Sequence, residues 1–328
     1  MKALVYTGVK TLEYLSVDEP VAADGSALIE VEAVGICGSD MHAWAGHDER
    51  RPAPLILGHE AAGTVRGGAL DGRRVTVNPL VSCGRCEWCE RGQDNLCPSR
   101  QIISMPPREG AFAEQLAMPA SNLVEVPDHV PIEQAAMAEP LACGWHAVDR
   151  AIRGLQQEHA SARALVLGGG AIGLGAALCL RARGVTDVVV AETNPLRHAA
   201  VEAEGFAVVD PREADLTNGF QIVIDGVGYA ATRETASAAV RPGGVIAHIG
   251  LGQATDGLDI RRMTLQEITF IGTYTYSSQD FKDTCQAIFA GELGPLTWPE
   301  QRALADGGAA FDEIAAGTVA APKVVLRP

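Results

Sequence analysis

Hydrophobic and polar positions follow two different patterns along the chain. From about residue 163 onward, short and almost wholly apolar runs recur, separated by longer stretches with helical spacing. Strands buried on both faces of a parallel sheet have this composition, because helices cover the sheet on each side. The pattern therefore predicts an α/β unit whose strands lie at 164–167, 188–190, 222–224, 245–247 and 268–271.

Capping and turn residues mark the ends of helices in this half of the chain. Asn194 followed by Pro195 is typical of a helix start, because Asn accepts from free backbone N–H groups and Pro has none to leave unpaired. Gly205 is typical of the end of the same helix. The Arg-Pro-Gly-Gly segment at 241–244 predicts that another helix stops before the next strand begins.

The pattern before residue 135 is different. Short runs such as 27–31 and 74–77 are separated by Gly, Pro and Asp, and helical spacing is weak. These features predict a β-rich unit. The last apolar run, at 323–326, predicts a strand that returns to this first unit.

Length and charge narrow the classes of protein. The chain has 328 residues, which indicates two domains at about 100–200 residues each. A formal net charge of −15 disfavours nucleic acid and anionic membranes as partners. The N-terminus lacks the apolar region of a signal peptide, and no run of about 18 apolar residues predicts a membrane helix. We therefore expect a cytoplasmic protein.

Four of the eight cysteines lie within fifteen residues. Cys83, Cys86, Cys89 and Cys97 form the pattern C-x2-C-x2-C-x7-C. Thiolates at such spacings can surround a zinc ion, and a site closed by four thiolates has no open position, which indicates a structural role. The alternatives are unrelated buried cysteines and a nucleic-acid-binding zinc module, and the negative charge of the chain disfavours the latter.

A second set of metal-binding residue types is scattered over several segments. Cys37 precedes Gly38, and His59 is followed by Glu60. A thiolate, an imidazole and a carboxylate from different loops suit a zinc ion that keeps one position open for substrate. Glu139 lies in an apolar stretch, where it needs a partner such as a metal, its water or a cation. Cys143 is a rival ligand, although a core position is the simpler interpretation.

A glycine motif follows the first strand of the α/β unit. The segment 168–173 reads G-G-G-A-I-G, so Gly168, Gly170 and Gly173 satisfy the G-x-G-x-x-G pattern, with Ile172 between the last two. The motif lies between a predicted strand and a predicted helix, as a dinucleotide-binding turn requires. The helix N-terminus would then face the pyrophosphate. The alternative is a tight glycine turn that binds no nucleotide.

The second strand of the unit bears on the choice of cofactor. It ends at Glu192, about 20 residues beyond the glycines, where a carboxylate can accept hydrogen bonds from the adenosine ribose. A carboxylate would also repel a 2′-phosphate, so we expect NAD and not NADP. Arg197 lies close in sequence and is the alternative, because it could attract that phosphate.

Together these motifs resemble the zinc-containing medium-chain dehydrogenase/reductase (alcohol dehydrogenase) family, in particular its polyol and threonine dehydrogenase branches. The resemblance spans nearly the whole chain, and it is weakest at 206–220 and 292–318. It implies a GroES-like β-barrel catalytic domain at 1–139, completed by 290–328. It also implies a Rossmann domain with a doubly wound parallel sheet at 140–289, and an active site between the two.

The resemblance also implies roles for single residues. Cys37, His59 and Glu60 would hold a catalytic zinc, with Glu139 as the fourth ligand or as the acceptor for a zinc-bound water. Together with the four-cysteine site, this makes two zinc ions per subunit. Ser39 matches the residue that accepts the substrate proton. His42 would then pass this proton to solvent.

The expected reaction is the NAD-dependent oxidation of a small secondary alcohol, most simply a polyol, by a homo-oligomer, either a dimer or a tetramer. Two departures from the family are visible: the segment 64–72 is short, and Thr275 replaces an arginine common before the tyrosine that matches Tyr276 in sorbitol dehydrogenases. A charged substrate is the alternative, namely a phosphorylated polyol, a sugar acid or a threonine-like amino acid. Its anion could meet Arg50, Arg51, Arg100 or Arg108. A non-catalytic NAD-binding protein is the alternative of another class.

Overall fold

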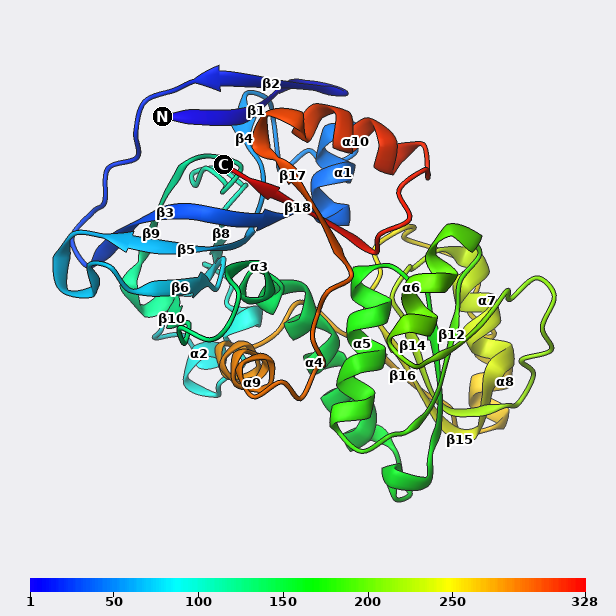
Figure 1. Ribbon diagram of the computed structural model, residues 1–328. Helices are drawn as coiled ribbons and strands as arrows, with labels where there is room; N and C mark the ends of the chain where they lie inside the picture. Colours follow the sequence, from blue (N-terminus) through cyan, green and yellow to red (C-terminus); the bar gives the residue numbers. More distant parts are fainter.

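The computed structural model describes residues 1–328 and divides into a β-rich unit and an α/β unit that lie side by side (Figure 1). The α/β unit is built on one six-stranded sheet in which every neighbouring pair is parallel. The strand order β13-β12-β11-β14-β15-β16 is that of a doubly wound dinucleotide-binding sheet. The strands are β11 (Arg163–Leu167), β12 (Asp187–Ala191), β13 (Ala207–Val209), β14 (Phe220–Asp225), β15 (Val240–His248) and β16 (Thr269–Gly272).

Successive residues of these strands pack against opposite layers of helices. On β11, Val166 belongs to the core shared with α4 and α5, whereas Leu165 and Leu167 belong to the core shared with α7 and α8. Burial on both faces explains why the strand sequences are apolar without alternation. The helices of this unit are α4 (Ala138–Gly154), α5 (Ala171–Ala182), α6 (His198–Ala203), α7 (Ala230–Ala239), α8 (Ile260–Leu265) and α9 (Ser278–Phe289), with 3₁₀ turns η4 (His159–Ser161) and η5 (Pro195–Arg197).

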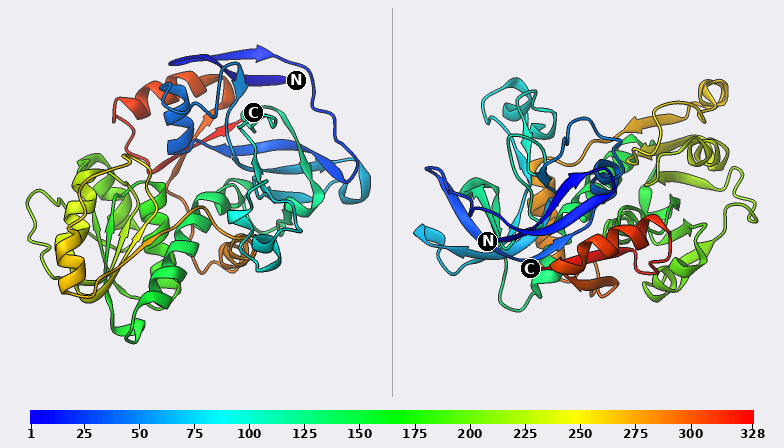
Figure 2. Two further views of the ribbon diagram at one scale, coloured as in Figure 1. Left: turned by 180° about the vertical axis from the view of Figure 1, so that it is seen from behind. Right: turned by 90° about the horizontal axis from the view of Figure 1, so that it is seen from above.

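The β-rich unit is formed by both ends of the chain, and the two termini lie in it in every view (Figure 2). Its main sheet has the order β10-β6-β5-β3-β18-β17, with β9 also paired to β3. As predicted, the C-terminal strand returns to this unit, where Leu326 of β18 pairs with Val34 of β3. The strands of this sheet are β3 (Ser26–Gly35), β5 (Glu60–Arg66), β6 (Arg74–Val77), β9 (Gln115–Pro119), β10 (Leu123–Glu125), β17 (Pro299–Ala303) and β18 (Lys323–Arg327).

Smaller elements complete this unit. One three-stranded sheet contains β1 (Lys2–Gly8), β2 (Thr11–Ser16) and β4 (Leu55–Ile56), and one two-stranded sheet contains β7 (Leu80–Val81) and β8 (Gln101–Ile102). The helices are α1 (Gly38–Trp44), α2 (Glu87–Glu90), α3 (Ile132–Ala135) and α10 (Gly307–Ala315), with 3₁₀ turns η1 (Gly68–Leu70), η2 (Asp94–Leu96), η3 (Ala120–Asn122) and η6 (Leu304–Asp306). None of the helices has the length and apolarity needed to span a lipid bilayer.

One strand boundary differs from the sequence-based expectation. Strand β15 begins at Val240 and continues through 241–244, because Phe220 pairs with Val240 before a register shift. The predicted stop of the preceding helix holds, since α7 ends at Ala239, but the turn residues form part of the strand. The expected domain boundary between residues 139 and 140 falls in the first turn of α4.

Candidate metal centres and dinucleotide cleft

Four cysteine side chains converge in the lobe that contains α2 and η2. The sulfur atoms of Cys83, Cys86, Cys89 and Cys97 all lie within 4.8 Å of one another, and none is in a disulfide. The Cys86–Cys89 and Cys83–Cys89 sulfur pairs are 3.5 and 4.0 Å apart. Four sulfurs around one zinc at about 2.3 Å would be separated by about 3.8 Å, so this group fits a closed tetrahedral site. We call residues 83–100 the four-cysteine lobe.

The second metal-binding group lies where the β-rich unit faces the α/β unit. The ligand atoms of Cys37, His59 and Glu60 lie within 4.8 Å of one another. Cys37 immediately precedes α1, and Glu60 is the first residue of β5. One carboxylate oxygen of Glu60, Oε2, is buried and has no hydrogen-bond partner. An orphaned buried carboxylate oxygen beside a thiol and an imidazole fits a cation bound between them.

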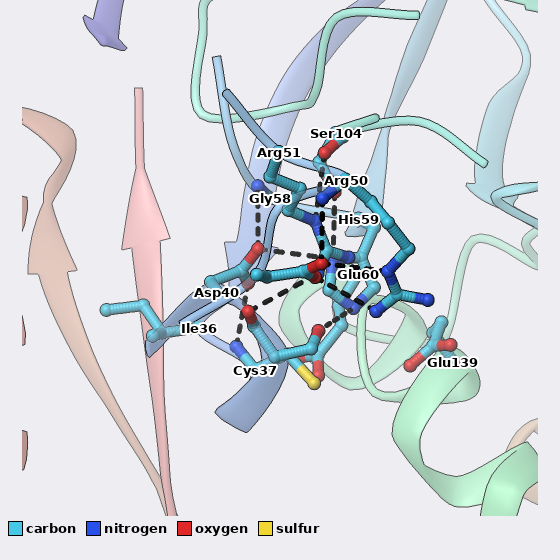
Figure 3. A network of polar contacts seen from close by, with 12 residues as sticks. Ile36, Cys37, Asp40, Arg50, Arg51, Gly58, His59, Glu60, Ser104 and Glu139 are labelled. Atoms are coloured by element: carbon cyan, nitrogen blue, oxygen red, sulfur yellow. Dashed lines mark hydrogen bonds and ion pairs between the residues drawn. The ribbon is translucent and has the colours of Figure 1, made fainter. Parts of the chain in front are cut away.

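Second-layer contacts orient the imidazole and the carboxylate of this group (Figure 3). His59 Nδ1 lies 3.3 Å from Asp40 Oδ1, which leaves Nε2 as the nitrogen available to a metal. Burial alone would lower the pKa of His59, but the charges of Asp40 and Cys37 raise it well above its ordinary value. Lys323 Nζ donates to Glu60 Oε1 at 2.7 Å and to the carbonyl of Ile36 at 2.8 Å. The group thus lies in an acidic surrounding that favours a positive charge.

Glu139 reaches the same region from the first turn of α4 (Figure 3). Burial raises the pKa of Glu139 to about 7, and the Glu60 carboxylate pushes it in the same direction although His59 opposes it. The buried phenol of Tyr276 donates to Glu139 Oε1 at 2.8 Å. A carboxylate with one oxygen held in this way can act as a ligand or accept a hydrogen bond from a ligand water. Cys143, the rival ligand, is not part of the converging group.

The two residues expected to move the substrate proton both lie on α1. Ser39 and His42 are three positions apart, so they share a face of the helix. Ser39 Oγ is 3.4 Å from His59 Nε2. No hydrogen bond joins Ser39 to His42; the ring of His42 instead lies 6.5 Å from that of His47.

The glycine motif adopts the turn that its sequence predicts. Gly168 has a positive φ of 98°, and Gly170 is the N-cap of α5. A β-carbon at Gly173 would lie 1.8 Å from the carbonyl oxygen of Gly168, so only glycine allows the helix to approach the strand this closely. A cleft of about 620 Å³ is lined by this motif, including Ile172, and also by Cys37. The turn and the cysteine of the second group therefore share one cleft.

Glu192 lies at the end of β12 and contributes to the same cleft. Its Oε2 accepts from the N–H of Gly169 and its Oε1 from the N–H of Asn194, both at 2.7 Å. Arg197 also lines the cleft; its Nη1 lies 3.7 Å from Glu192 Oε2, and its buried Nε has no partner. The carboxylate therefore lies at the strand end expected for a ribose acceptor, with a cation beside it.

The arginines considered for a charged substrate are mostly engaged by the protein. Arg51 is buried and donates to the carbonyl of Ser104 and to Asp48. Arg100 stacks on the ring of Tyr274 at 4.8 Å. Arg108 bonds to Gln101 and Arg50 to Asp48; among these four, the side chain of Arg50 is 61% exposed despite its ion pair.

Sequence reasoning missed two residues of this site. Lys323 was predicted only as part of a strand, and its ion pair with Glu60 joins residues at opposite ends of the chain. Asp40 was not recognised as the partner of His59. A Lys at the first position of an otherwise apolar strand is a signal that could have identified the contact of Lys323 with Glu60, because a buried ammonium group needs a carboxylate partner.

Comparison with known proteins accounts for both units. A family model described as alcohol dehydrogenase GroES-like domain matches residues 23–128, and one described as zinc-binding dehydrogenase matches residues 171–290. The chain is 33% identical over 298 residues to sorbitol dehydrogenase from Bacillus subtilis, which covers 85% of this chain and 83% of that protein. It is 32% identical over 310 residues to L-galactonate-5-dehydrogenase from Escherichia coli, with 89% and 88% covered.

The fold is also similar to solved structures. An Escherichia coli oxidoreductase of unknown specificity superposes with a TM-score of 0.90 at 27% identity, and the match covers 99% of this chain and 98% of that chain. The similarity thus extends over both units and over their relative placement.

Proposed function

The chain belongs to the zinc-dependent alcohol dehydrogenase family, and from this premise we propose that it oxidises a secondary hydroxyl of a small polyol to the ketone with NAD⁺. One observation carries the proposal: Cys37 and the glycine motif line the same cleft of about 620 Å³. A dinucleotide on the motif and a metal held by Cys37 would then act on one substrate. The names of the sorbitol and L-galactonate relatives support a polyhydroxylated substrate.

We propose two zinc ions per subunit. We call Cys37, His59 and Glu60 the open metal group. This group would hold one ion, with Glu139 or a water completing its ligands, and the four-cysteine lobe would hold the other. When bound, the first zinc would supply the Lewis acidity that lowers the pKa of a substrate hydroxyl, and NAD⁺ would supply the acceptor for the hydride. The negative charges of a thiolate and a carboxylate would weaken the Lewis acidity of this zinc, so that the oxidised product can leave.

The protein's own side chains handle the proton. In this proposal Ser39 Oγ accepts the proton of the substrate hydroxyl, because it lies at the same side of His59 as the ligand nitrogen Nε2. As it does so, Ser39 gives up its own hydroxyl proton, which passes to solvent by way of His42, one helical turn further along α1 and not in direct contact with Ser39. Asp40 keeps the His59 ring in one tautomer and orientation, and Lys323 does the same for the Glu60 carboxylate.

Two further proposals concern the surroundings of the enzyme. We propose a cytoplasmic location, since four close thiols stay available to a metal in a reducing compartment. We also propose a homo-oligomer that pairs through the α/β unit. Strand β16 is an edge of its sheet, and the nearby side chains of Ile260 and Leu265 are 62% and 70% exposed.

A substrate panel tests the proposed reaction. Zinc-loaded protein is offered NAD⁺ with sorbitol, other polyols, L-galactonate, a polyol phosphate and L-threonine, and NADH formation is followed. We expect turnover with an uncharged polyol. Selective turnover of an anionic substrate, lost in Arg50→Ala, would instead favour the charged-substrate alternative, because the side chain of Arg50 is 61% exposed. Absence of turnover with every alcohol would contradict the proposal.

A further inference from the structure

The segment 274–278 is held by the four-cysteine lobe although the two are remote in sequence. Asn95 Nδ2 donates to the carbonyl of Tyr274 at 2.8 Å. At the other end of the segment, the N–H of Ser278 donates to Asp94 Oδ1 at 2.9 Å, and its hydroxyl donates to Asp94 Oδ2. Asp94 and Asn95 belong to η2, between the third and fourth cysteines, and both are buried. Two adjacent residues of the lobe therefore form hydrogen bonds with both ends of the segment.

The backbone of the segment 274–278 is strained at Thr275. Thr275 has a positive φ of 47°, a region that β-branched residues rarely adopt. Such a conformation persists only where surrounding contacts enforce it. The hydrogen bonds to Tyr274 and Ser278 lie on either side of Thr275 and supply that enforcement.

The next residue, Tyr276, connects this segment to the open metal group. Tyr276 is 1% exposed, and its phenol donates to Glu139 Oε1. Glu139 lies in the first turn of α4 and is buried beside the group of Cys37, His59 and Glu60. A rotation of the backbone at Thr275 would move the phenol away from this carboxylate.

We propose that Asp94 and Asn95 are positioning residues for the reaction: through the segment 274–278 they hold the Tyr276 phenol on Glu139. The four-cysteine lobe then has a second role besides local folding, since it sets the position of one carboxylate of the open metal group. This inference rests on the proposed dehydrogenase function for its kinetic consequences, but the contacts themselves can be tested without turnover.

A simpler account is that helix packing alone places Tyr276. Helices α4 and α9 are also joined by His146 Nδ1 and Asp280 Oδ2 at 2.9 Å, and the ring of Tyr276 lies 5.6 Å from that of Phe281. If these contacts alone positioned Tyr276, loss of the hydrogen bonds from Asp94 and Asn95 to the segment 274–278 would leave Glu139 unaffected. The two accounts therefore differ in what Asn95→Ala does at Glu139.

Amide hydrogen exchange tests these hydrogen bonds independently of activity. In zinc-loaded protein, Asn95→Ala and Ser278→Ala should speed exchange at 274–278, on the order of tenfold, because each removes a partly buried hydrogen bond that holds the segment. Exchange at the start of α4, around Glu139, should rise with it. The matched control is Arg91→Ala, which removes only an exposed ion pair with Glu87 in the same lobe. Unchanged exchange around Glu139 in both test variants would overturn the proposal.

A double-mutant cycle gives the kinetic test. Tyr276→Phe should lower kcat about 10–100-fold, the usual cost of losing a partner of a metal-site carboxylate. Asn95→Ala should lower kcat with little change in NADH affinity, and the double variant should be no slower than Tyr276→Phe alone. Multiplied losses, or wild-type kcat in Asn95→Ala, would overturn the proposal. Zinc content is measured in each variant. If Asn95→Ala loses the zinc of the four-cysteine lobe, Ser278→Ala replaces it in the cycle.

The two kinds of failure remain distinguishable. A wild-type protein that oxidises no alcohol would contradict the proposed function, while the exchange experiment would still decide whether the lobe holds Tyr276 on Glu139.

Discussion

Glu192 is the single residue on which the choice of dinucleotide depends. Its oxygens accept from the N–H groups of Gly169 and Asn194, and these two hydrogen bonds fix its position. A carboxylate held at this strand end can accept from ribose hydroxyls and opposes a 2′-phosphate. The adjacent Arg197 has an unpartnered buried Nε and would become the dominant charge if the carboxylate were removed.

Replacement of Glu192 with Ser should therefore change cofactor preference. NAD⁺ binding is expected to weaken by about 1–3 kcal/mol, the magnitude for lost charge-assisted hydrogen bonds, and NADP⁺ binding to improve. The measurement is the ratio of kcat/KM for the two cofactors with one substrate. Glu202→Ser, an exposed change on α6, is the control. An unchanged ratio in Glu192→Ser would mean that this carboxylate does not face the ribose.

At the scale of elements, helix α9 is stabilised by its N-terminal cap. Ser277 and Asp280 form a reciprocal capping box, and His146 of α4 donates to Asp280. Burial alone would raise the pKa of Asp280, but the hydrogen bonds from His146 and Ser277 lower it below the ordinary value of 3.8. A group with a lowered folded-state pKa stabilises the fold above its unfolded-state pKa, and this stabilisation is lost as the pH falls through the folded-state value.

Asp280→Asn should accordingly lower the melting temperature at neutral pH, with a loss of about 0.5–2 kcal/mol for the weakened cap. The difference from wild type should shrink as the pH falls below about 4, where the wild-type carboxylate becomes protonated. Thermal unfolding at both pH values measures this, and Asp283→Asn in the same helix is the control. A difference that stays constant with pH would show that the charge of Asp280 contributes nothing.

The four-cysteine lobe should depend on its metal for folding. Its helices α2 and η2 span only four and three residues, so they contribute little stability of their own. Cys86→Ser removes one thiolate and should lower both zinc content and melting temperature, because structural metal binding contributes directly to folding. Glu139→Ala should instead reduce turnover with little effect on melting. A Cys86→Ser variant that melts like wild type would contradict the assignment of this lobe.

The Rossmann sheet and the glycine turn were predictable because their signals are local. Burial on both faces gives β11 and β14 apolar sequences, and the close approach at Gly173 leaves room for glycine alone. The extension of β15 back to Val240 was not predictable, because 241–244 reads as a turn and becomes strand only through pairing with β14.

The contacts around the open metal group were less accessible to sequence reasoning. Lys323 meets Glu60, and Tyr276 meets Glu139, across 263 and 137 positions of sequence. Such pairings follow from how β18 returns to β3 and how α9 packs on α4, and no local spacing encodes them. The same holds for the contacts of Asp94 and Asn95 with the segment 274–278.

For the whole molecule, the central claim is that a zinc bound by the open group and a dinucleotide on the glycine motif act together in one cleft. The most direct test compares wild type with Cys37→Ser after removal of metal by a chelator and stepwise return of Zn²⁺. Wild type should regain NADH formation from its alcohol as its second zinc per subunit binds. Cys37→Ser should take up only the zinc of the four-cysteine lobe and bind NADH as wild type does, but form no NADH. Recovery of wild-type turnover by Cys37→Ser, or turnover by wild type without returned zinc, would contradict the account.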